Sequence, residues 1–497
     1  MQRVSMPLPA EVSELLIPLD PQSDTPLHRQ IYHGLREAIL SGRLPSGLRI
    51  PSTRLLAGSL GVSRSTILVA FEQLVADGFI VGSVGSGSYV ATELPARLLA
   101  NRAAVPSPPG GKVRVADRVR QLESLTPTGW RIPHPPAPFR AGTPPLDQFP
   151  AAQWSRFLAR RARTLSSAEL QYGKPLGYLP LREAIVAHHA AVRGVRCTPE
   201  QVIVLASAQE ALELSCRVLL DPGDPAWLEE PFYHGARGAY LLAGARAVPV
   251  PVDDEGLAVD MGIALAPEAR LATVTPSHQY PLGVTMSLPR RLALLEWARD
   301  TGAWILEDDY DSEYRYGSQP LTALQGLDGS GRVLYIGTFS KTLFPSLRLA
   351  YLVVPEPLID SFLRVRRVGA QHAPTLDQAV LRDFIVDGQY ARHIRRMRTL
   401  CRERRDALVE AAKRDAADVL ELMVPETGLH TIAWLRDGVD DRVAHAAVTA
   451  RGVDVAPLSN YYMGDCPRPG LILGFAGYPV DALGASLRIM AEALRQL

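Results

Sequence analysis

The chain has 497 residues, of which 47% are hydrophobic and 21% are charged. This length predicts two to four domains, and this composition excludes a disordered chain. The formal net charge of +1 excludes a globally basic nucleic-acid coat but is compatible with a local basic face. No run of 18 apolar residues occurs, and the start of the chain lacks the pattern of a secretion signal. We therefore expect no membrane association and a cytoplasmic location.

Cysteine and lysine are both scarce in this sequence. The four cysteines are scattered without a C-x-x-C pair, so we expect no disulfide framework and no metal site. Of the 53 basic residues only four are lysines, at positions 112, 174, 341 and 413. Because the chain so strongly prefers arginine, each lysine becomes a candidate for chemistry that arginine cannot perform.

Proline marks the boundaries of the domains. Twelve of the 41 prolines fall between residues 92 and 150, and such a stretch is typical of a semi-rigid linker. We divide the chain into an N-terminal domain at 20–91, a linker at 92–138 and a large domain at 139–497. A short helix is expected near the middle of the linker, over 113–122.

The N-terminal domain shows three helices followed by two strands. The apolar pattern predicts a helix over 27–40, a second helix capped by Ser52 and a third capped by Ser63. Strands over 79–81 and 89–91 enclose a turn rich in glycine and serine. Apolar side chains of the second and third helices, including those of Leu55, Leu56, Leu60 and Val75, are expected to face the core. This order of elements is that of a winged helix-turn-helix.

A helix-turn-helix places the first turn of its second helix at base edges in the major groove. Here that turn is Arg64-Ser65-Thr66, flanked by arginines that can hold phosphates and by a wing tip without bulk. The residues expected to contact DNA are Arg49, Ser52, Arg54, Ser63, Arg64, Ser65, Thr66 and Gly85. Because this shape also occurs in proteins that never touch DNA, spacing alone leaves a purely structural role open.

The residues of this domain add a family pattern. They carry L-P-x-G-x-x-[IL]-P-S-[TS]-R followed by L-G-V-S-R-[ST]-T. From Pro26 to Val90 the segment closely resembles the GntR-type winged helix. This resemblance implies sequence-specific binding to double-stranded DNA.

The large domain alternates predicted strands with helices, which indicates an α/β fold with a mainly parallel sheet covered on both faces. Ligands of such sheets bind at the carboxyl ends of the strands. The predicted elements are strands at 202–205, 226–229, 304–306, 333–337 and 349–354, and helices at 209–220 and 290–300.

The residues that follow these strands suit pyridoxal phosphate (PLP). The segment 206–209 offers free N–H groups to a phosphate, 307–310 offers carboxylates and a phenol, and 338–341 offers hydroxyls and a lysine. PLP needs a lysine for its aldehyde, a carboxylate for its pyridine nitrogen, and hydroxyls and an arginine such as Arg348 for its phosphate. An aromatic surface for the ring follows another strand, at Phe232-Tyr233.

Lys341 is the best candidate for the aldehyde because it directly follows a predicted strand in a hydroxyl-rich loop. No central strand precedes Lys174, Lys112 lies in the linker, and Lys413 lies in a charged helix. The alternative interpretation is that Lys341 is a surface lysine and Asp308 a helix cap.

Residues 139–497 also resemble a fold-type-I, class I aminotransferase, most plainly in the segments QYGKPLGYLPLREAI, SAQEALEL, EDDYDSEY and GTFSKTLFPSLRLAY. Fused behind a GntR-type winged helix, this domain resembles the MocR subfamily of bacterial transcriptional regulators, including its PdxR-like members. The resemblance implies the PLP-dependent transferase fold type I, with a mainly parallel sheet and a smaller C-terminal α+β subdomain.

The resemblance also implies a role for each candidate residue. Lys341 would carry PLP as a Schiff base, Asp308 would pair with its pyridine nitrogen, and Tyr310 would face its phenolate oxygen. Tyr233 would stack on the ring, and Tyr172 would reach the phosphate in the partner subunit of a domain-exchanged homodimer. The remaining phosphate contacts would come from Ala208, Gln209, Thr338, Ser340 and Arg348.

Two positions depart from the aminotransferase pattern. Tyr280 stands where an asparagine usually supports the cofactor oxygen, as is usual for MocR-like sequences. Ile472 stands where an arginine usually grips the substrate carboxylate, and isoleucine cannot donate a hydrogen bond. Arg468 lies upstream and would take that place if the alignment shifted.

Three hypotheses for the function stay open at this point. The chain is a regulator that senses PLP itself and controls PLP synthesis, a regulator that senses an amino acid or amine as an external aldimine of PLP, or an active aminotransferase with an accessory DNA-binding domain. Ile472 favours the first hypothesis, and turnover of amino acids would favour the third. The sequence leaves enzymatic turnover undecided.

Overall fold

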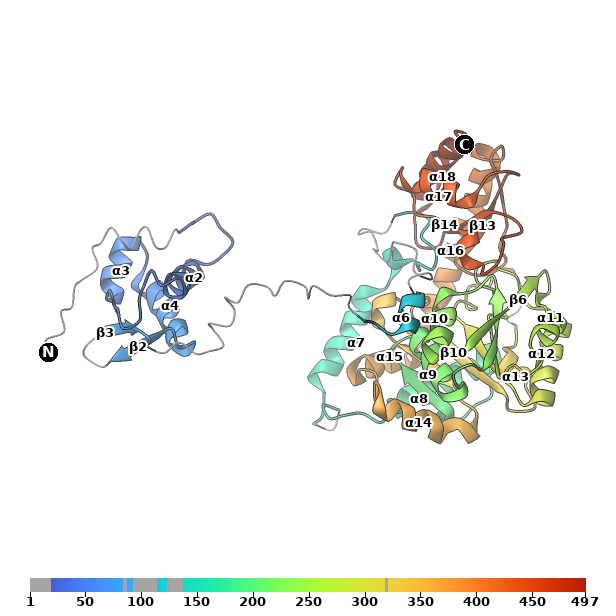
Figure 1. Cartoon of the computed structure of the whole chain (residues 1–497), viewed down its shortest axis with the longest axis horizontal. Helices are drawn as coiled ribbons and strands as arrows, with labels where there is room; N and C mark the ends of the chain where they lie inside the picture. Colours follow the sequence, from blue (N-terminus) through green and yellow to red (C-terminus); the bar gives the residue numbers. More distant parts are fainter. Residues whose placement is uncertain are drawn as a thin grey trace. The chain divides into compact units, whose positions relative to one another are not determined.

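The computed structural model describes residues 19–83, 87–92, 114–122, 125, 137–167, 169–317 and 321–497. The chain divides into two compact units, Met1–Arg114 and Val115–Leu497 (Figure 1). Within the described residues, no helix combines the length and the apolar character needed to cross a membrane.

The N-terminal unit is a winged helix-turn-helix, as expected. A third strand, Arg49–Ile50, joins the two predicted ones. The sequence analysis did not predict it, because two residues are too few to show an alternating pattern. The three strands form an antiparallel sheet in the order β1-β3-β2. The elements are α2 (Leu27–Leu40), β1 (Arg49–Ile50), α3 (Thr53–Leu60), α4 (Arg64–Ala76), β2 (Ile80–Ser83) and β3 (Gly87–Val90).

Serine caps and an apolar core hold this unit together. Ser52 Oγ accepts a hydrogen bond from the Leu55 N–H at 3.3 Å, and Ser63 Oγ accepts one from the Thr66 N–H at 3.1 Å. Leu56 is buried, but Leu55 is 62% exposed and Val75 is 48% exposed. Both were wrongly expected to face the core. Leu55 lies about 100° around the helix from Leu56, and Val75 lies in the last turn of α4.

The large unit is built on an eight-stranded sheet in the order β4-β11-β10-β9-β8-β5-β6-β7. The strands β10, β9, β8, β5 and β6 run parallel, which confirms the mainly parallel sheet. β11 is antiparallel to both neighbours. The connection between β10 and β11 is too short for the crossover that two parallel strands need, so β11 runs antiparallel to β10. The strands are β4 (Val202–Leu205), β5 (Pro225–Glu230), β6 (Arg246–Asp253), β7 (Gly256–Leu257), β8 (Leu271–Val274), β9 (Trp304–Asp309), β10 (Val333–Thr338) and β11 (Ala350–Val353).

Both faces of this sheet are buried. Along β4, Ile203 and Leu205 belong to one apolar cluster, while Val202 and Val204 belong to another. Successive side chains of a strand point to opposite faces, so each cluster is the core between the sheet and one layer of helices. The helices of this part are α6 (Asp117–Leu122), α7 (Ala151–Arg163), α8 (Leu179–Arg193), α9 (Ala208–Leu219), α10 (His234–Ala243), α11 (Val259–Leu265), α12 (Leu288–Thr301), α13 (Leu324–Leu327), α14 (Ile359–Val368) and α15 (Thr375–Val386).

The end of the chain forms the expected α+β subdomain, in orange and red in Figure 1. Its four-stranded antiparallel sheet has the order β12-β13-β15-β14 and packs on three helices. The elements are α16 (Gln389–Asp415), β12 (Leu420–Leu422), β13 (His430–Leu435), α17 (Asp441–Thr449), β14 (Ala456–Pro457), β15 (Gly470–Gly474) and α18 (Val480–Leu494).

The register of the parallel strands determines where the candidate site residues lie. Asp308 of β9 lies beside Ile336 of β10, and Lys341 follows the end of β10. The carboxylate and the lysine therefore meet at the carboxyl edge of the sheet.

Candidate functional site

A cavity of about 380 Å³ opens at this edge. Nine of the ten residues that the sequence assigns to PLP line it. Tyr172 does not line it, and its side chain is 87% exposed. The nine are Ala208, Gln209, Tyr233, Asp308, Tyr310, Thr338, Ser340, Lys341 and Arg348.

Lys341 reaches into the cavity from the loop between β10 and β11. Its Nζ donates a hydrogen bond to the Gly142 carbonyl at 2.9 Å. Gly142 has a φ of 74°, which favours glycine, and a Cβ there would lie 2.7 Å from Nζ and would displace the amine. Burial lowers the pKa of Lys341, while Asp311 and Asp308 oppose that shift. A lowered pKa favours the neutral amine, which is the form that attacks an aldehyde.

Asp308 is a buried carboxyl without a matching cation. Burial raises its pKa to about 7, Asp309 and Glu229 add to the shift, and Lys341 opposes it. Its Oδ1 has no hydrogen-bond partner among the described residues. A protonated pyridine nitrogen would supply both the missing donor and the missing charge. The orphaned oxygen thus fits the ring of PLP.

Several of the lining residues have groups that suit a phosphate. Ser207 caps α9 by accepting a hydrogen bond from the Glu210 N–H at 3.1 Å, and Ala208 and Gln209 begin that helix at the cavity wall. The N–H groups of a helix N-terminus attract anions. Thr338, Ser340 and Arg348 add hydroxyls and a guanidinium to the lining of the same cavity. Arg348 holds a left-handed backbone conformation at a φ of 52°.

Aromatic side chains form one wall of the cavity. The ring of Tyr280 makes edge contacts with those of Tyr233, Tyr310 and His430, at centroid distances of 5.8, 6.0 and 5.2 Å. The Tyr280 hydroxyl donates to the Tyr461 hydroxyl at 3.4 Å. Tyr280 therefore lines the site, at the position where aminotransferases usually carry asparagine.

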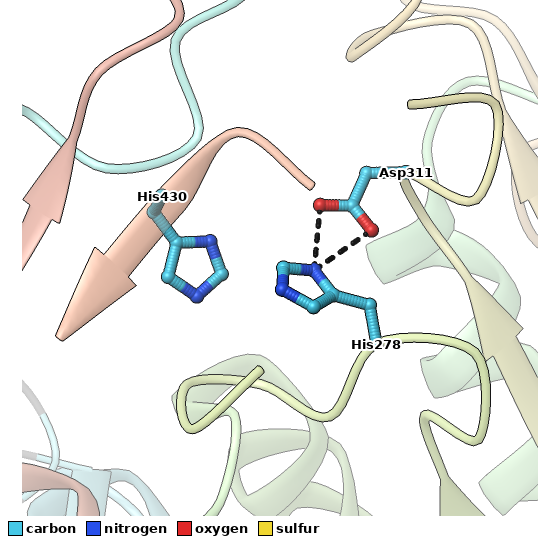
Figure 2. A group of neighbouring side chains, drawn as sticks. All are labelled: His278, Asp311 and His430. Atoms are coloured by element: carbon cyan, nitrogen blue, oxygen red, sulfur yellow. Dashed lines mark hydrogen bonds and ion pairs between the residues drawn. The ribbon is translucent and has the colours of Figure 1, made fainter. Parts of the chain in front are cut away.

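Beside this wall lies a buried group that the sequence analysis missed: His278, Asp311 and His430 (Figure 2). His278 Nδ1 lies 2.9 Å from Asp311 Oδ2 and 3.0 Å from the Tyr310 hydroxyl. An ionised carboxylate only accepts, so Nδ1 carries the hydrogen. The hydroxyl proton of Tyr310 then stays available to another acceptor, such as a cofactor oxygen.

Both imidazoles of this group keep an unused lone pair. In the neutral imidazole of His278 that donates through Nδ1 to Asp311, Nε2 is an acceptor, and this buried atom has no hydrogen-bond partner among the described residues. His430 Nε2 donates to the Pro281 carbonyl at 3.0 Å, so its Nδ1 is an acceptor too. Burial lowers the pKa of His430 to about 3, and His278 adds to that shift. His430 is therefore neutral at physiological pH.

The carboxylate-binding arginine of aminotransferases has no equivalent among the described lining residues. Ile472 is fully buried in β15, between Ile432 of β13 and Ala456 of β14. Arg468 is half-exposed, forms an ion pair with Glu421 and lies over the ring of Trp434. The shifted alignment therefore does not bring Arg468 into the cavity.

In the N-terminal unit most of the predicted DNA-contacting side chains are exposed. Arg49, Arg54 and Arg64 are exposed, and Arg64 Nε donates to Thr53 Oγ1 at 3.4 Å. The hydroxyls of Ser65 and Thr66 lie 2.7 and 2.8 Å from Ser63 Oγ. Ser52 and Ser63 act as helix caps, and Gly85 lies outside the described residues.

Sequence reasoning missed the residues that reach the cavity from distant segments. Ser207 and Asp311 adjoin predicted strand ends and could have been included, whereas Thr275 follows β8, a strand that the sequence analysis did not predict. Gly142 and His430 come from opposite ends of the large domain and carry no local signal, because only the tertiary fold brings them to Lys341.

Comparisons with known proteins agree with this architecture. Residues 139–470 match the family "Aminotransferase class I and II", and residues 27–90 match "Bacterial regulatory proteins, gntR family". The chain is 42% identical to the "Probable rhizopine catabolism regulatory protein MocR" of Rhizobium meliloti, over 97% of this chain and 96% of the relative. It is 29% identical to the "HTH-type pyridoxine biosynthesis transcriptional regulator PdxR" of Corynebacterium glutamicum, over 97% and 99%.

Among solved structures, the large unit is similar to two aminotransferases. One is the kynurenine aminotransferase of Pyrococcus horikoshii in complex with PMP, with 27% identity, coverage of 78% of this chain and 95% of that one, and a TM-score of 0.67. The other is LysN, the alpha-aminoadipate aminotransferase of Thermus thermophilus, complexed with N-(5'-phosphopyridoxyl)-L-leucine. It has 28% identity, coverage of 77% and 95%, and a TM-score of 0.67.

Proposed function

This chain belongs to the MocR subfamily of GntR-type transcriptional regulators, which join a winged helix-turn-helix to an aminotransferase-like domain. From that premise we propose that it binds PLP on Lys341 and that the state of this cofactor controls its affinity for an operator DNA in the cytoplasm.

One observation carries the proposal: the Lys341 amine and the unpartnered Asp308 carboxyl line the same cavity as the amino end of α9. PLP, when bound, supplies an aldehyde that condenses with amines and a ring that draws electrons. Lys341 would hold the aldehyde carbon, Asp308 would keep the ring nitrogen protonated, and the Tyr310 hydroxyl would donate to the ring oxygen. Ser207, Ser340 and Arg348 would surround the phosphate.

The regulatory step requires two states that bind DNA differently. A ligand changes DNA affinity only if it binds the free and DNA-bound protein with different affinities. We place this coupling in a homodimer that exchanges its N-terminal units. Tyr172 supports that assembly, because its exposed ring adjoins His372 and is free to meet a partner's cofactor site.

The test is fluorescence-anisotropy binding to DNA from upstream of the chain's own gene and its neighbours. PLP-free and PLP-saturated protein are compared at one fixed salt concentration, because phosphate contacts make the affinity salt-dependent. A shift of tenfold or more, about 1.4 kcal/mol of coupling, supports PLP as the signal. Specific binding without any shift overturns the coupling, and no specific binding in either form overturns the regulatory function in favour of an aminotransferase.

A further inference from the structure

The residues assigned to PLP cover only part of the cavity wall. We propose that the remaining part, which comprises Tyr280, Asp311, Leu429 and His430 with His278 behind them, binds a small primary amine that carries hydroxyl groups and no carboxylate. This proposal rests on the proposed function, because it names the class of effector that the PLP site would admit.

The first argument is the lack of a cation for a carboxylate. Among the described residues that line the cavity, the cations are Lys341 and Arg348, and both are assigned to the cofactor. Arg140 adjoins the cavity in sequence, but its guanidinium is paired with Asp454. An effector carboxylate would lose its water without gaining a partner, and it would face the carboxylates of Asp308 and Asp311. Burying an unpaired charge costs several kcal/mol.

The second argument is an excess of hydrogen-bond acceptors. His430 lines the cavity, and its Nδ1 is an acceptor because its Nε2 donates to the Pro281 carbonyl at 3.0 Å. Behind it, the buried Nε2 of His278 has no partner among the described residues, and Figure 2 shows that this edge of the ring faces His430. The ring centroids of the two histidines are 4.9 Å apart. These acceptors require donors, and a hydroxyl group supplies a donor without a charge.

The third argument concerns size and skeleton. The cavity of about 380 Å³ must hold the cofactor as well, so the amine is small. Its carbon atoms would lie against the rings of Tyr233, Tyr280 and Tyr310, whose faces are apolar and carry partial negative charge. Such a wall suits an amine with alcohol substituents and disfavours an anion.

Matched pairs of amines test the proposal directly. Serinol and L-serine differ by one hydroxymethyl group in place of a carboxylate, and ethanolamine and glycine differ in the same way. Each is titrated into PLP-loaded protein, and binding is followed by calorimetry and by the visible absorption of the cofactor. We expect each amino alcohol to bind at least tenfold more tightly than its amino acid. Equal or tighter binding of the amino acids, or no binding of either amino alcohol, overturns the proposal.

A variant of His430 separates recognition from folding, because an amine without hydroxyl groups serves as its control. His430→Phe should weaken serinol about tenfold and change propylamine, which has no hydroxyl, by less than twofold. An equal loss for both amines would overturn the role of His430 as an acceptor. If wild-type protein shows no visible band with PLP, the proposed function itself fails before the amines are tested.

Discussion

The two units of the chain use charged side chains in opposite ways. In the N-terminal unit Arg49, Arg54 and Arg64 are exposed to solvent. In the large unit Asp308 is buried and Lys341 half-buried, and the pKa values of both are shifted toward the neutral form. The exposed arginines suit a polyanion such as DNA, which releases its counterions when it binds. Asp308 and Lys341, in contrast, suit a small molecule that displaces water from the cavity. Substitutions in the two units should therefore produce different kinds of loss.

The largest effect should follow from Lys341→Ala. The variant loses the only amine that reaches the aldehyde position among the described residues, so we expect a complete loss of the visible band of PLP-loaded protein. The winged helix keeps its own core, so specific DNA binding should persist but no longer respond to PLP. Spectrophotometry and anisotropy measure the two outcomes. If the band survives, a lysine other than Lys341 must carry the Schiff base.

A large loss of stability is expected from Arg193→Met. The Arg193 guanidinium is buried and pairs with Asp309 at 2.9 Å, while the Tyr335 hydroxyl also donates to Asp309 at 2.7 Å. Removing the cation leaves a buried carboxylate without its partner, which costs about 3–5 kcal/mol. Urea unfolding of the large unit measures this change. The exposed neighbour Arg196→Met is the control and should change the free energy of unfolding by less than about 0.5 kcal/mol.

A smaller effect, confined to DNA, is expected from Arg64→Ala. Loss of a base contact should cost about 1–3 kcal/mol with the specific operator and much less with unrelated DNA. Arg54→Ala, which removes a phosphate contact, should weaken both DNAs alike and reduce the salt slope by about 1. Anisotropy at several salt concentrations distinguishes the two. Equal losses on both DNAs for Arg64→Ala would place this arginine on the backbone instead of the bases.

The smallest effect concerns pH. In PLP-free protein the pKa of Asp308 is raised to about 7, so its contribution to stability is full below about pH 4 and is lost as the pH rises through 7. A protonated ring nitrogen restores a partner for the ionised form. PLP should therefore raise the melting temperature by about 2–4 °C more at pH 8 than at pH 6. Scanning calorimetry tests this, and Asp308→Asn should remove the difference.

The fold of both units and half of the residues that line the cavity could be predicted from the sequence, because they depend on local patterns. Lys341 and Asp308 each adjoin a strand end, and parallel strands bring their carboxyl ends together. The group of His278, Asp311 and His430 escaped prediction because its members come from three loops or strands of two subdomains. Leu55 was misplaced because an eight-residue helix with adjacent leucines does not define its buried face.

The predicted role of Tyr172 depends on a contact between two subunits. Its resemblance-based role lies in a second subunit, and in a single chain its ring is exposed. No pattern in one chain can fix a contact between two chains, so this role stays a prediction.

The hydrogen bond from Lys341 to Gly142 has a mechanical consequence. Shortly before Gly142, Phe139 is fully buried and bridges to Gly474, so the backbone over residues 139–142 is held both at the small sheet and at the lysine. A Schiff base on Lys341 would replace its ammonium and would therefore change the contact with the Gly142 carbonyl. The first residues of the large domain would then respond to the covalent state of the lysine.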